Sequence, residues 1–454
     1  MTALTALLPA AALLAAATVL PPHPATASAE GRDPSVAPYV VVLKDTTGRA
    51  PTRALAAEAA EAGDQVGPVY DTALNGFAVR TTSARAAALA ADPRVASVEA
   101  DTRFRISDDT PPTPVPPVGT TAPATPTTPA APTAPVTTPT APTTPTTSAP
   151  PPSAAPDTTP ITTPVTTTQS TAPWPLDRID QRELPLDGAY TYATQAEGVT
   201  VYVVDTGINT AHEEFGGRAR SGVNTVFMGG ANDCNGHGTH VAATIGGATY
   251  GVAKGVSLVA VKVADCRGDG SLSAILKGLD WMVKDATKGM ASITPKGPYV
   301  ANMSMGGTRS HAMDAAVIRA VASGITFTAA AGNDGRNACA GSPAAVPQAL
   351  TVGATDASDR RPSFSNYGSC VDISAPGVAV TSAWKGSPTA LARASGTSMA
   401  APHVAGAAAL VLAAGTARTP AQVGQALVRA AVSDRITGLP AGTPNLLLHL
   451  PTDR

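Results

Sequence analysis

The chain has 454 residues and a net charge of −2, and only 14% of its residues are charged, against about 25% in typical globular proteins. This near-neutral balance excludes nucleic acid and an anionic membrane surface as obvious partners. The length exceeds one ordinary domain and provides material for a large core. Twenty of the 43 prolines lie within residues 107–173, so each segment is interpreted separately.

Residues 1–29 have the features of a secretory signal peptide. An apolar run from Leu4 to Leu20 precedes Ala27-Ser28-Ala29, a small-x-small cleavage pattern. No Lys or Arg precedes the run, which departs from the usual signal pattern. The run is short for a membrane-spanning helix, and no later segment could span a bilayer. We therefore expect a secreted, extracellular protein with no stable membrane insertion after the signal is removed.

Residues 38–106 are predicted to form a small α+β domain. Strands are expected over 39–43, 75–80 and 94–106, and helices over 52–62 and 83–91, the second capped by Ser83. A β-α-β-β-α-β pattern of this kind indicates a ferredoxin-like, split βαβ sandwich.

Residues 107–173 form a linker in which Pro, Thr and Ala dominate. Such a composition cannot bury a core, so we expect a disordered, largely polyproline II spacer. A glycosylated or binding stalk is the alternative interpretation.

Residues 174–454 alternate between strand and helix patterns. Strands are predicted over 199–204, 258–263, 299–303, 325–330 and 349–353, and helices over 240–245, 272–286, 312–323, 404–414 and 420–431. This alternation predicts an α/β domain with a mostly parallel sheet covered by helices on both faces.

Three segments of this domain carry an acid, an imidazole and a hydroxyl. Asp205 follows a buried strand, His237 lies between two glycines, and Ser398 precedes an all-apolar helix. Each has a structural interpretation when taken alone: a turn-forming Asp, a core His and a helix-capping Ser. Together they form a set suited to nucleophilic catalysis, because the serine needs a base and the base needs a carboxylate that fixes its tautomer.

A zinc site is the alternative for the histidine segment. Cys234, His237 and His240 are spaced by three residues, and Cys266 could be a fourth ligand. The glutamate of the H-E-x-x-H motif is missing, and an even number of cysteines in an exported chain is better explained by disulfides, with three possible pairings. His240, beside Val241, is interpreted as a core histidine.

The segments 203–207, 235–242 and 396–406 closely resemble those of subtilisin-like serine peptidases. The resemblance covers 174–454 and has three motifs in the order Asp, His, Ser. It implies an endopeptidase that acts on protein and peptide substrates.

The resemblance also implies a role for each site residue. Asp205 would orient and stabilise His237, which would act as general base and then general acid. Ser398 would attack the peptide carbonyl, and Asn333 would donate to the oxyanion together with the Ser398 N–H.

Substrate contacts are implied in the same way, by strand addition of an extended peptide. The residues concerned are Gly268, Gly270, Ser304, Met305, Gly306, Ala330, Ala331 and Gly332. Small residues on both walls predict a roomy first pocket that accepts large apolar side chains.

The cysteine intervals resemble those of the proteinase K and aqualysin branch. That resemblance implies the disulfides Cys234–Cys266 and Cys339–Cys370. It also implies a structural calcium ion held by a carboxylate and two backbone carbonyls, for which a solvated Asp is the alternative. The calcium ligands would be Pro347, Ala349 and Asp372.

The domain at 38–106 resembles the inhibitory pro-domain of the same peptidases, whose C-terminal tail occupies the active cleft. We expect a monomeric precursor that is cut soon after Ile106 and trimmed towards Trp174. The alternative function is a catalytically silent binding or scaffold protein that uses the cleft without cutting.

Overall fold

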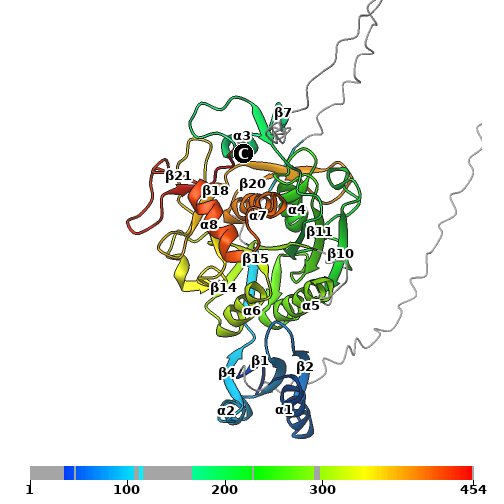
Figure 1. Cartoon of the computed structure of the whole chain (residues 1–454). Coiled ribbons are helices and arrows are strands. Elements are labelled where there is room, and N and C mark those ends of the chain that lie inside the picture. The colour runs from blue at the N-terminus through cyan, green and yellow to red at the C-terminus, as the bar shows by residue number, and fades with distance from the viewer. Residues whose placement is uncertain are drawn as a thin grey trace, which may run out of the picture.

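The structure, a computed structural model, comprises a small N-terminal domain beneath a large domain built on one twisted sheet (Figure 1). It describes residues 35–44, 48–106, 112–115, 166–226, 230–290 and 297–451. The predicted signal peptide and most of the predicted linker lie outside these residues.

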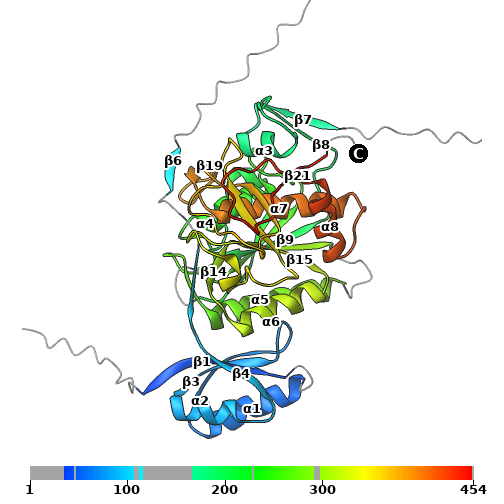
Figure 2. The same cartoon turned by 90° about the vertical axis from the view of Figure 1, so that its left-hand side faces the viewer.

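The small domain is the predicted α+β sandwich. Its four-stranded sheet has the order β2-β3-β1-β4 with antiparallel neighbours, and both helices lie on the face turned away from the large domain (Figure 2). The elements are β1 (Val36–Leu43), α1 (Arg49–Glu61), β2 (Gln65–Tyr70), β3 (Gly76–Thr82), α2 (Ser83–Ala90) and β4 (Val95–Ala100). The predicted Ser83 cap is wrong by one residue, because the Thr82 side chain accepts the Arg85 N–H at 3.3 Å.

The last predicted strand of this domain, 94–106, divides into two strands. β4 stays in the small sheet, whereas β5 (Arg103–Ile106) crosses into the large domain. There β5 pairs antiparallel with β12 (Asp269–Ser271) on one side and β14 (Met305–Thr308) on the other. The chain thus leaves one sheet and completes another.

The large domain has a nine-stranded sheet in the order β10-β11-β9-β13-β15-β17-β18-β22-β21. All its pairings are parallel except that of β21 with β22, which confirms the predicted architecture. The strands are β9 (Thr200–Asp205), β10 (Ala219–Asn224), β11 (Ser257–Lys262), β13 (Tyr299–Met303), β15 (Ile325–Ala330), β17 (Leu350–Thr355), β18 (Ile373–Pro376), β21 (Val432–Ser433) and β22 (Leu446–Leu447).

Helices cover both faces of this sheet. The apolar helix α7 packs with α4 and α8 on one face, and α5 and α6 cover the other face, between the sheet and the small domain (Figures 1 and 2). The helices are α3 (Trp174–Ile179), α4 (His237–Gly246), α5 (Leu272–Met290), α6 (His311–Ala322), α7 (Thr397–Ala413) and α8 (Pro420–Ala430). No helix among the described residues is long and apolar enough to cross a membrane.

Both described ends of the predicted linker pair with the large domain. β6 (Thr113–Val115) joins β20 (Leu391–Ala394), the second strand of a hairpin with β19 (Val380–Ala383). β7 (Thr167–Ser170) pairs with β8 (Ala189–Tyr192). The ordered large domain therefore begins before residue 174. The other short elements are η2 (Glu213–Phe215), η3 (Ala338–Ala340) and β16 (Gly341–Ser342).

Candidate active site

Asp205 and His237 meet at the carboxyl edge of the parallel sheet. Asp205 ends β9 and His237 begins α4, and both side chains are buried. His237 Nδ1 lies 2.7 Å from Asp205 Oδ1, which also accepts the Thr206 N–H at 2.7 Å. This contact fixes the imidazole and directs its other nitrogen, Nε2, away from the carboxylate.

Ser398 is the second residue of α7, and α7 packs against α4. The helix begins earlier than the 404–414 predicted, so Pro402 lies inside it. Because proline has no N–H, the i−4 carbonyl of Ser398 lacks its usual helical donor. That carbonyl accepts the Ser304 hydroxyl at 2.9 Å, and the Ser398 hydroxyl donates to the Ser304 carbonyl at 3.0 Å. Ser304 thus fixes the segment that carries the candidate nucleophile.

Asn333 follows β15 and faces the start of the same helix. Its amide oxygen accepts the Thr397 N–H at 2.9 Å and the Thr397 hydroxyl at 2.7 Å. The Thr397 hydroxyl also accepts the Gly332 N–H at 3.1 Å. With the oxygen held by Thr397, the amide nitrogen is the end of Asn333 that can serve as a donor elsewhere.

Asp233 was missed in the sequence, yet its buried carboxylate joins the two loops of the site. Oδ1 accepts the Thr206 hydroxyl at 2.9 Å, the Asn235 N–H at 2.9 Å and the Gly236 N–H at 2.8 Å. Oδ2 accepts the Thr239 N–H at 2.9 Å and its hydroxyl at 2.6 Å. The carboxylate therefore satisfies the first turn of α4 and ties it to the loop after Asp205. The sequence feature that could have identified Asp233 is its position three residues before Gly236-His237.

Lys262 brings a buried positive charge to the same loops. Its strand neighbour in β9 is Asp205, and its ammonium group donates to the Thr206 carbonyl. Burial lowers the pKa of Lys262, while Asp233 and Asp205 act in the opposite direction. The disulfide Cys234–Cys266 lies beside this lysine, whose Nζ is 3.6 Å from the Cys234 sulfur.

The zinc alternative for this segment is wrong, since Cys234 and Cys266 are bonded to each other. His240 is buried, its Nε2 contacts the Val380 carbonyl at 3.0 Å, and burial lowers its pKa to about 3. A neutral imidazole in this setting fits the predicted core histidine. Within the described ranges, no group of three His, Cys, Asp or Glu side chains could hold a metal ion.

The second predicted disulfide, Cys339–Cys370, is also confirmed. Asp372, a predicted calcium ligand, accepts the Thr351 N–H at 2.8 Å. Burial raises the pKa of Asp372 to about 6, partly offset by that hydrogen bond. No cationic side chain in the described part of the chain pairs with this carboxylate, so a bound cation would fit its environment.

The candidate substrate segments hold the tail of the small domain. Phe104 lies opposite Gly270 in β12, and Arg105 and Ile106 lie opposite Gly306 and Met305 in β14. The Ile106 N–H donates to the Gly268 carbonyl at 3.0 Å. The strand register thus places the predicted tail of the pro-domain between the two predicted substrate segments.

Glycines on both sides of the tail leave room for its side chains. A Cβ on Gly268 would lie 2.5 Å from the Ile106 side chain, and one on Gly307 would lie 2.9 Å from the Phe104 ring. A pocket beside the tail is lined by small residues, among them Gly306, Ala330, Ala331 and Gly332, and also by the charged side chains of Arg103, Arg105, Asp334 and Arg336. That this pocket accepts large apolar side chains of a substrate stays a prediction.

Three carboxylates join the two domains away from this cleft. Glu99 accepts the Ser310 hydroxyl at 2.8 Å and the Ala312 N–H at 2.9 Å, at the start of α6. Asp101 accepts the Ser273 N–H at 2.8 Å and its hydroxyl at 2.6 Å, at the start of α5. Both anions lie at the positive ends of helix dipoles.

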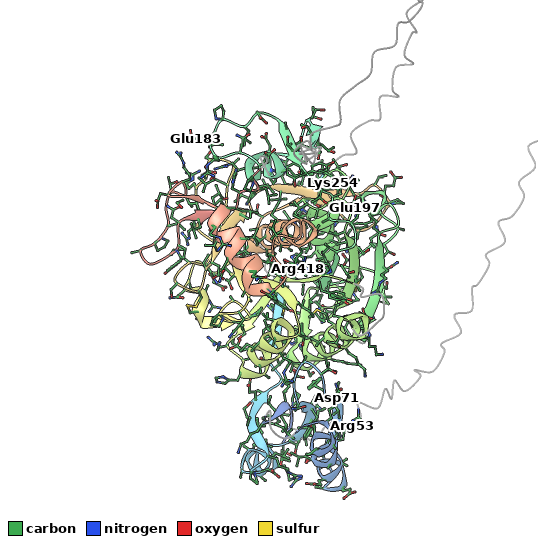
Figure 3. The ribbon with its side chains drawn as sticks, viewed as in Figure 1. Arg53, Asp71, Glu183, Glu197, Lys254 and Arg418 are labelled. Atoms are coloured by element: carbon green, nitrogen blue, oxygen red, sulfur yellow. A yellow bond between two sulfur atoms is a disulfide. The ribbon has the colours of Figure 1, made fainter. Side chains whose placement is uncertain are left out.

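The third carboxylate, Asp280 on α5, holds a turn of the small domain. Its Oδ1 accepts the N–H groups of Asp71, Thr72 and Ala73 at 3.1, 2.6 and 2.8 Å. Arg53 pairs with Asp71 at 2.6 Å on the small-domain side (Figure 3). Burial raises the pKa of Asp280, and the three N–H groups act against that rise.

Comparisons with known proteins agree with this geometry. The chain matches the subtilase family over residues 196–447 and the peptidase inhibitor I9 family over residues 38–107. An extracellular serine proteinase of Thermus sp. (strain Rt41A) is 45% identical over 390 residues, covering 86% of this chain and 78% of that protein. The alkaline serine exoprotease A of Vibrio alginolyticus is 51% identical over 287 residues, covering 63% of this chain and 51% of that protein. The crystal structure of a cold adapted subtilisin-like serine proteinase matches with a TM-score of 0.58 and 50% identity, covering 62% of this chain and 98% of that one. The chain therefore belongs to the subtilase family of serine peptidases and carries an I9-type pro-domain.

Proposed function

We propose that the chain is a secreted serine endopeptidase made as an autoinhibited precursor, acting through Asp205, His237 and Ser398. The observation that carries the proposal is the seating of β5 between β12 and β14. An extended polypeptide held there by backbone pairing enters the region where Ser304 contacts Ser398. Secretion rests on the predicted signal peptide and on the extracellular Thermus relative.

In the proposed mechanism, His237 takes the Ser398 proton as Oγ attacks the peptide carbonyl. The 2.7 Å contact with Asp205 keeps Nδ1 protonated and stabilises the imidazolium that forms. The imidazolium then protonates the leaving amine, and a water molecule hydrolyses the acyl-enzyme by the reverse sequence.

The negative charge of the tetrahedral intermediate needs donors that are already in place. We assign this role to the Asn333 amide nitrogen and the Ser398 N–H. Thr397 holds the amide oxygen of Asn333 through two hydrogen bonds, which supports the orientation. The positive end of α7 lies at the same point.

The pro-domain would inhibit by occupying the substrate strands before and after the maturation cut. Its anchors Glu99 and Asp101 bind α6 and α5, so they do not depend on the bond being cut. The predicted cut soon after Ile106 falls outside the described residues.

Calcium is proposed as a structural ion near Asp372. The Pro347 and Ala349 carbonyls, together with the Asp372 carboxylate, would supply oxygen ligands for a hard cation. A bound cation would stabilise a buried carboxylate whose pKa is raised to about 6 without one.

Labelling with an organofluorophosphonate tests the function. The secreted, processed protein should be labelled at Ser398 and should cleave internal bonds of a denatured protein, and the Ser398→Ala variant should do neither. A silent scaffold protein would ignore the reagent even when peptides bind. A protein that is neither labelled nor active after removal of the pro-domain would refute the proposal.

A further inference from the structure

The outer edge of β20 lies close to the candidate nucleophile in sequence and holds a strand of the chain itself. β20 ends at Ala394, and Ser398 follows in the first turn of α7. Thr113–Val115 pairs antiparallel with this edge, with Thr113 opposite Arg393 and Val115 opposite Leu391. Figure 2 shows β6 on the side of the large domain that carries β19. Without β6, the β19–β20 hairpin would expose an unpaired strand edge.

The same chain passes through the candidate cleft and reaches this edge. Ile106 lies opposite Met305 in the cleft, and Thr113 follows seven positions later. Seven residues of extended chain span at most about 25 Å. One continuous polypeptide therefore occupies both strand-binding places, the second one downstream of the first.

The contacts of β6 depend more on its backbone than on its side chains. Thr113 and Pro114 are exposed, and only Val115 is half-buried, beside the half-buried Leu391. Ala392 and Ala394 are buried, and Arg393 points into solvent. Backbone pairing of this kind tolerates many sequences.

We infer that β20 is an extended binding site for the part of a substrate polypeptide that lies downstream of the cleaved bond. It would pair with residues at positions +7 to +9, counted from the residue that takes the place of Ile106. The inference rests on the proposed peptidase function. In the precursor, Thr113–Val115 occupies the site in place of substrate.

Two quenched substrates of different length test this site on the secreted, active enzyme. Both share one sequence up to position +4, and only the longer continues to +9. We expect the longer substrate to have a kcat/KM about 5- to 20-fold higher, through a lower KM. N-methylation at +7 and +9 together should abolish the gain, because alternate residues of an antiparallel strand face the neighbour. N-methylation at +8 should leave the gain intact, since Pro114, which has no N–H, already stands at that position opposite Ala392. Equal kcat/KM for both lengths, or a gain that survives methylation at +7 and +9, overturns the inference.

Arg393 provides a second readout, because a directly opposed cross-strand pair is sensitive to charge. The wild-type enzyme should prefer Glu over Lys at +7 by about two- to fivefold, and Arg393→Glu should reverse the preference. Arg418→Glu makes the same charge change at an exposed residue after α7 (Figure 3) and should leave the ratio unchanged. An unchanged ratio in Arg393→Glu overturns the register. If even the shorter substrate is not cut, the proposed function fails; if it is cut and length has no effect, only this inference fails.

Discussion

Replacing Asp233 by Asn tests whether its carboxylate holds the candidate site together. The amide oxygen can keep the three bonds that Oδ1 accepts, from Thr206, Asn235 and Gly236. The amide nitrogen then faces the Thr239 N–H, which loses its acceptor in a buried place. An unsatisfied buried donor costs about 1–3 kcal/mol, and Lys262 also loses a neighbouring negative charge. We expect a loss of about 3 kcal/mol, equivalent to a Tm lower by about 6–12 °C.

The assay combines the Tm of the full-length Ser398→Ala precursor with kinetics of the active enzyme. A displaced first turn of α4 moves His237, so kcat should fall about 10- to 100-fold. KM should change little, because Asp233 does not contact the substrate strands. Asp356→Asn is the matched control: Asp356 accepts the Ser358 and Arg360 N–H groups in an exposed turn, and its loss should leave kcat unchanged. A kcat within twofold of wild type, with an unchanged Tm, would refute the reasoning.

Three further predictions follow from the site and its surroundings. Asn333→Ala should lower kcat about 10²- to 10³-fold with little change in KM, whereas Thr397→Ala, which removes only a supporting hydroxyl, should cost about tenfold or less; equal losses would place the oxyanion donor elsewhere. The folded pKa of Asp372 is about 6, above its unfolded value near 3.9. In the presence of a chelator, the stability that Asp372 contributes is therefore present below about pH 4. As the pH rises through 6, the free energy of unfolding should fall by about 2–3 kcal/mol. Asp372→Asn should remove both that fall and any rise in Tm on adding calcium; a calcium effect that persists in the variant would exclude this site. Asp280→Ala removes the acceptor of three N–H groups of the pro-domain, so the inhibition constant of the cleaved pro-domain against the mature enzyme should rise about 10- to 100-fold. The kcat of the mature enzyme should not change. An unchanged inhibition constant would show that those bonds carry no net affinity.

Uniformly buried elements were predicted from the sequence more accurately than segments that pass from one sheet to another. The strands at Tyr299–Met303 and Ile325–Ala330 have the predicted bounds, because short, wholly buried parallel strands read as continuous apolar runs. β2 follows from the β-α-β-β-α-β pattern but was given no range, because Gly67 and Pro68 interrupt its alternation; a register shift between Val66 and Val69 accommodates them.

The separation of β4 from β5 could not be predicted locally. The expected strand 94–106 alternates throughout, and only the partners available in the fold direct Arg103–Ile106 into another sheet. Asp233 was missed for a related reason. Its role lies in five hydrogen bonds to groups from two loops, and one of those loops is distant in sequence. Motifs identified the candidate acid, base and nucleophile, but the groups that position them depend on tertiary structure.

Two separate sets of contacts hold the pro-domain: strand pairing in the cleft, and hydrogen bonds to helices outside it. We expect this arrangement to keep the enzyme inhibited after the maturation cut. β5 is held by backbone pairing between strands, which any extended product could form. Glu99 and Asp101 instead cap α6 and α5 outside the cleft, so we expect their bonds to persist after a cut beyond Ile106. A severed tail therefore stays attached to a domain that keeps its own anchors, so its effective concentration at β12 and β14 remains high. We therefore expect release of activity to require loss of the carboxylate contacts or digestion of the pro-domain, and we expect cleavage of the tail alone not to be sufficient.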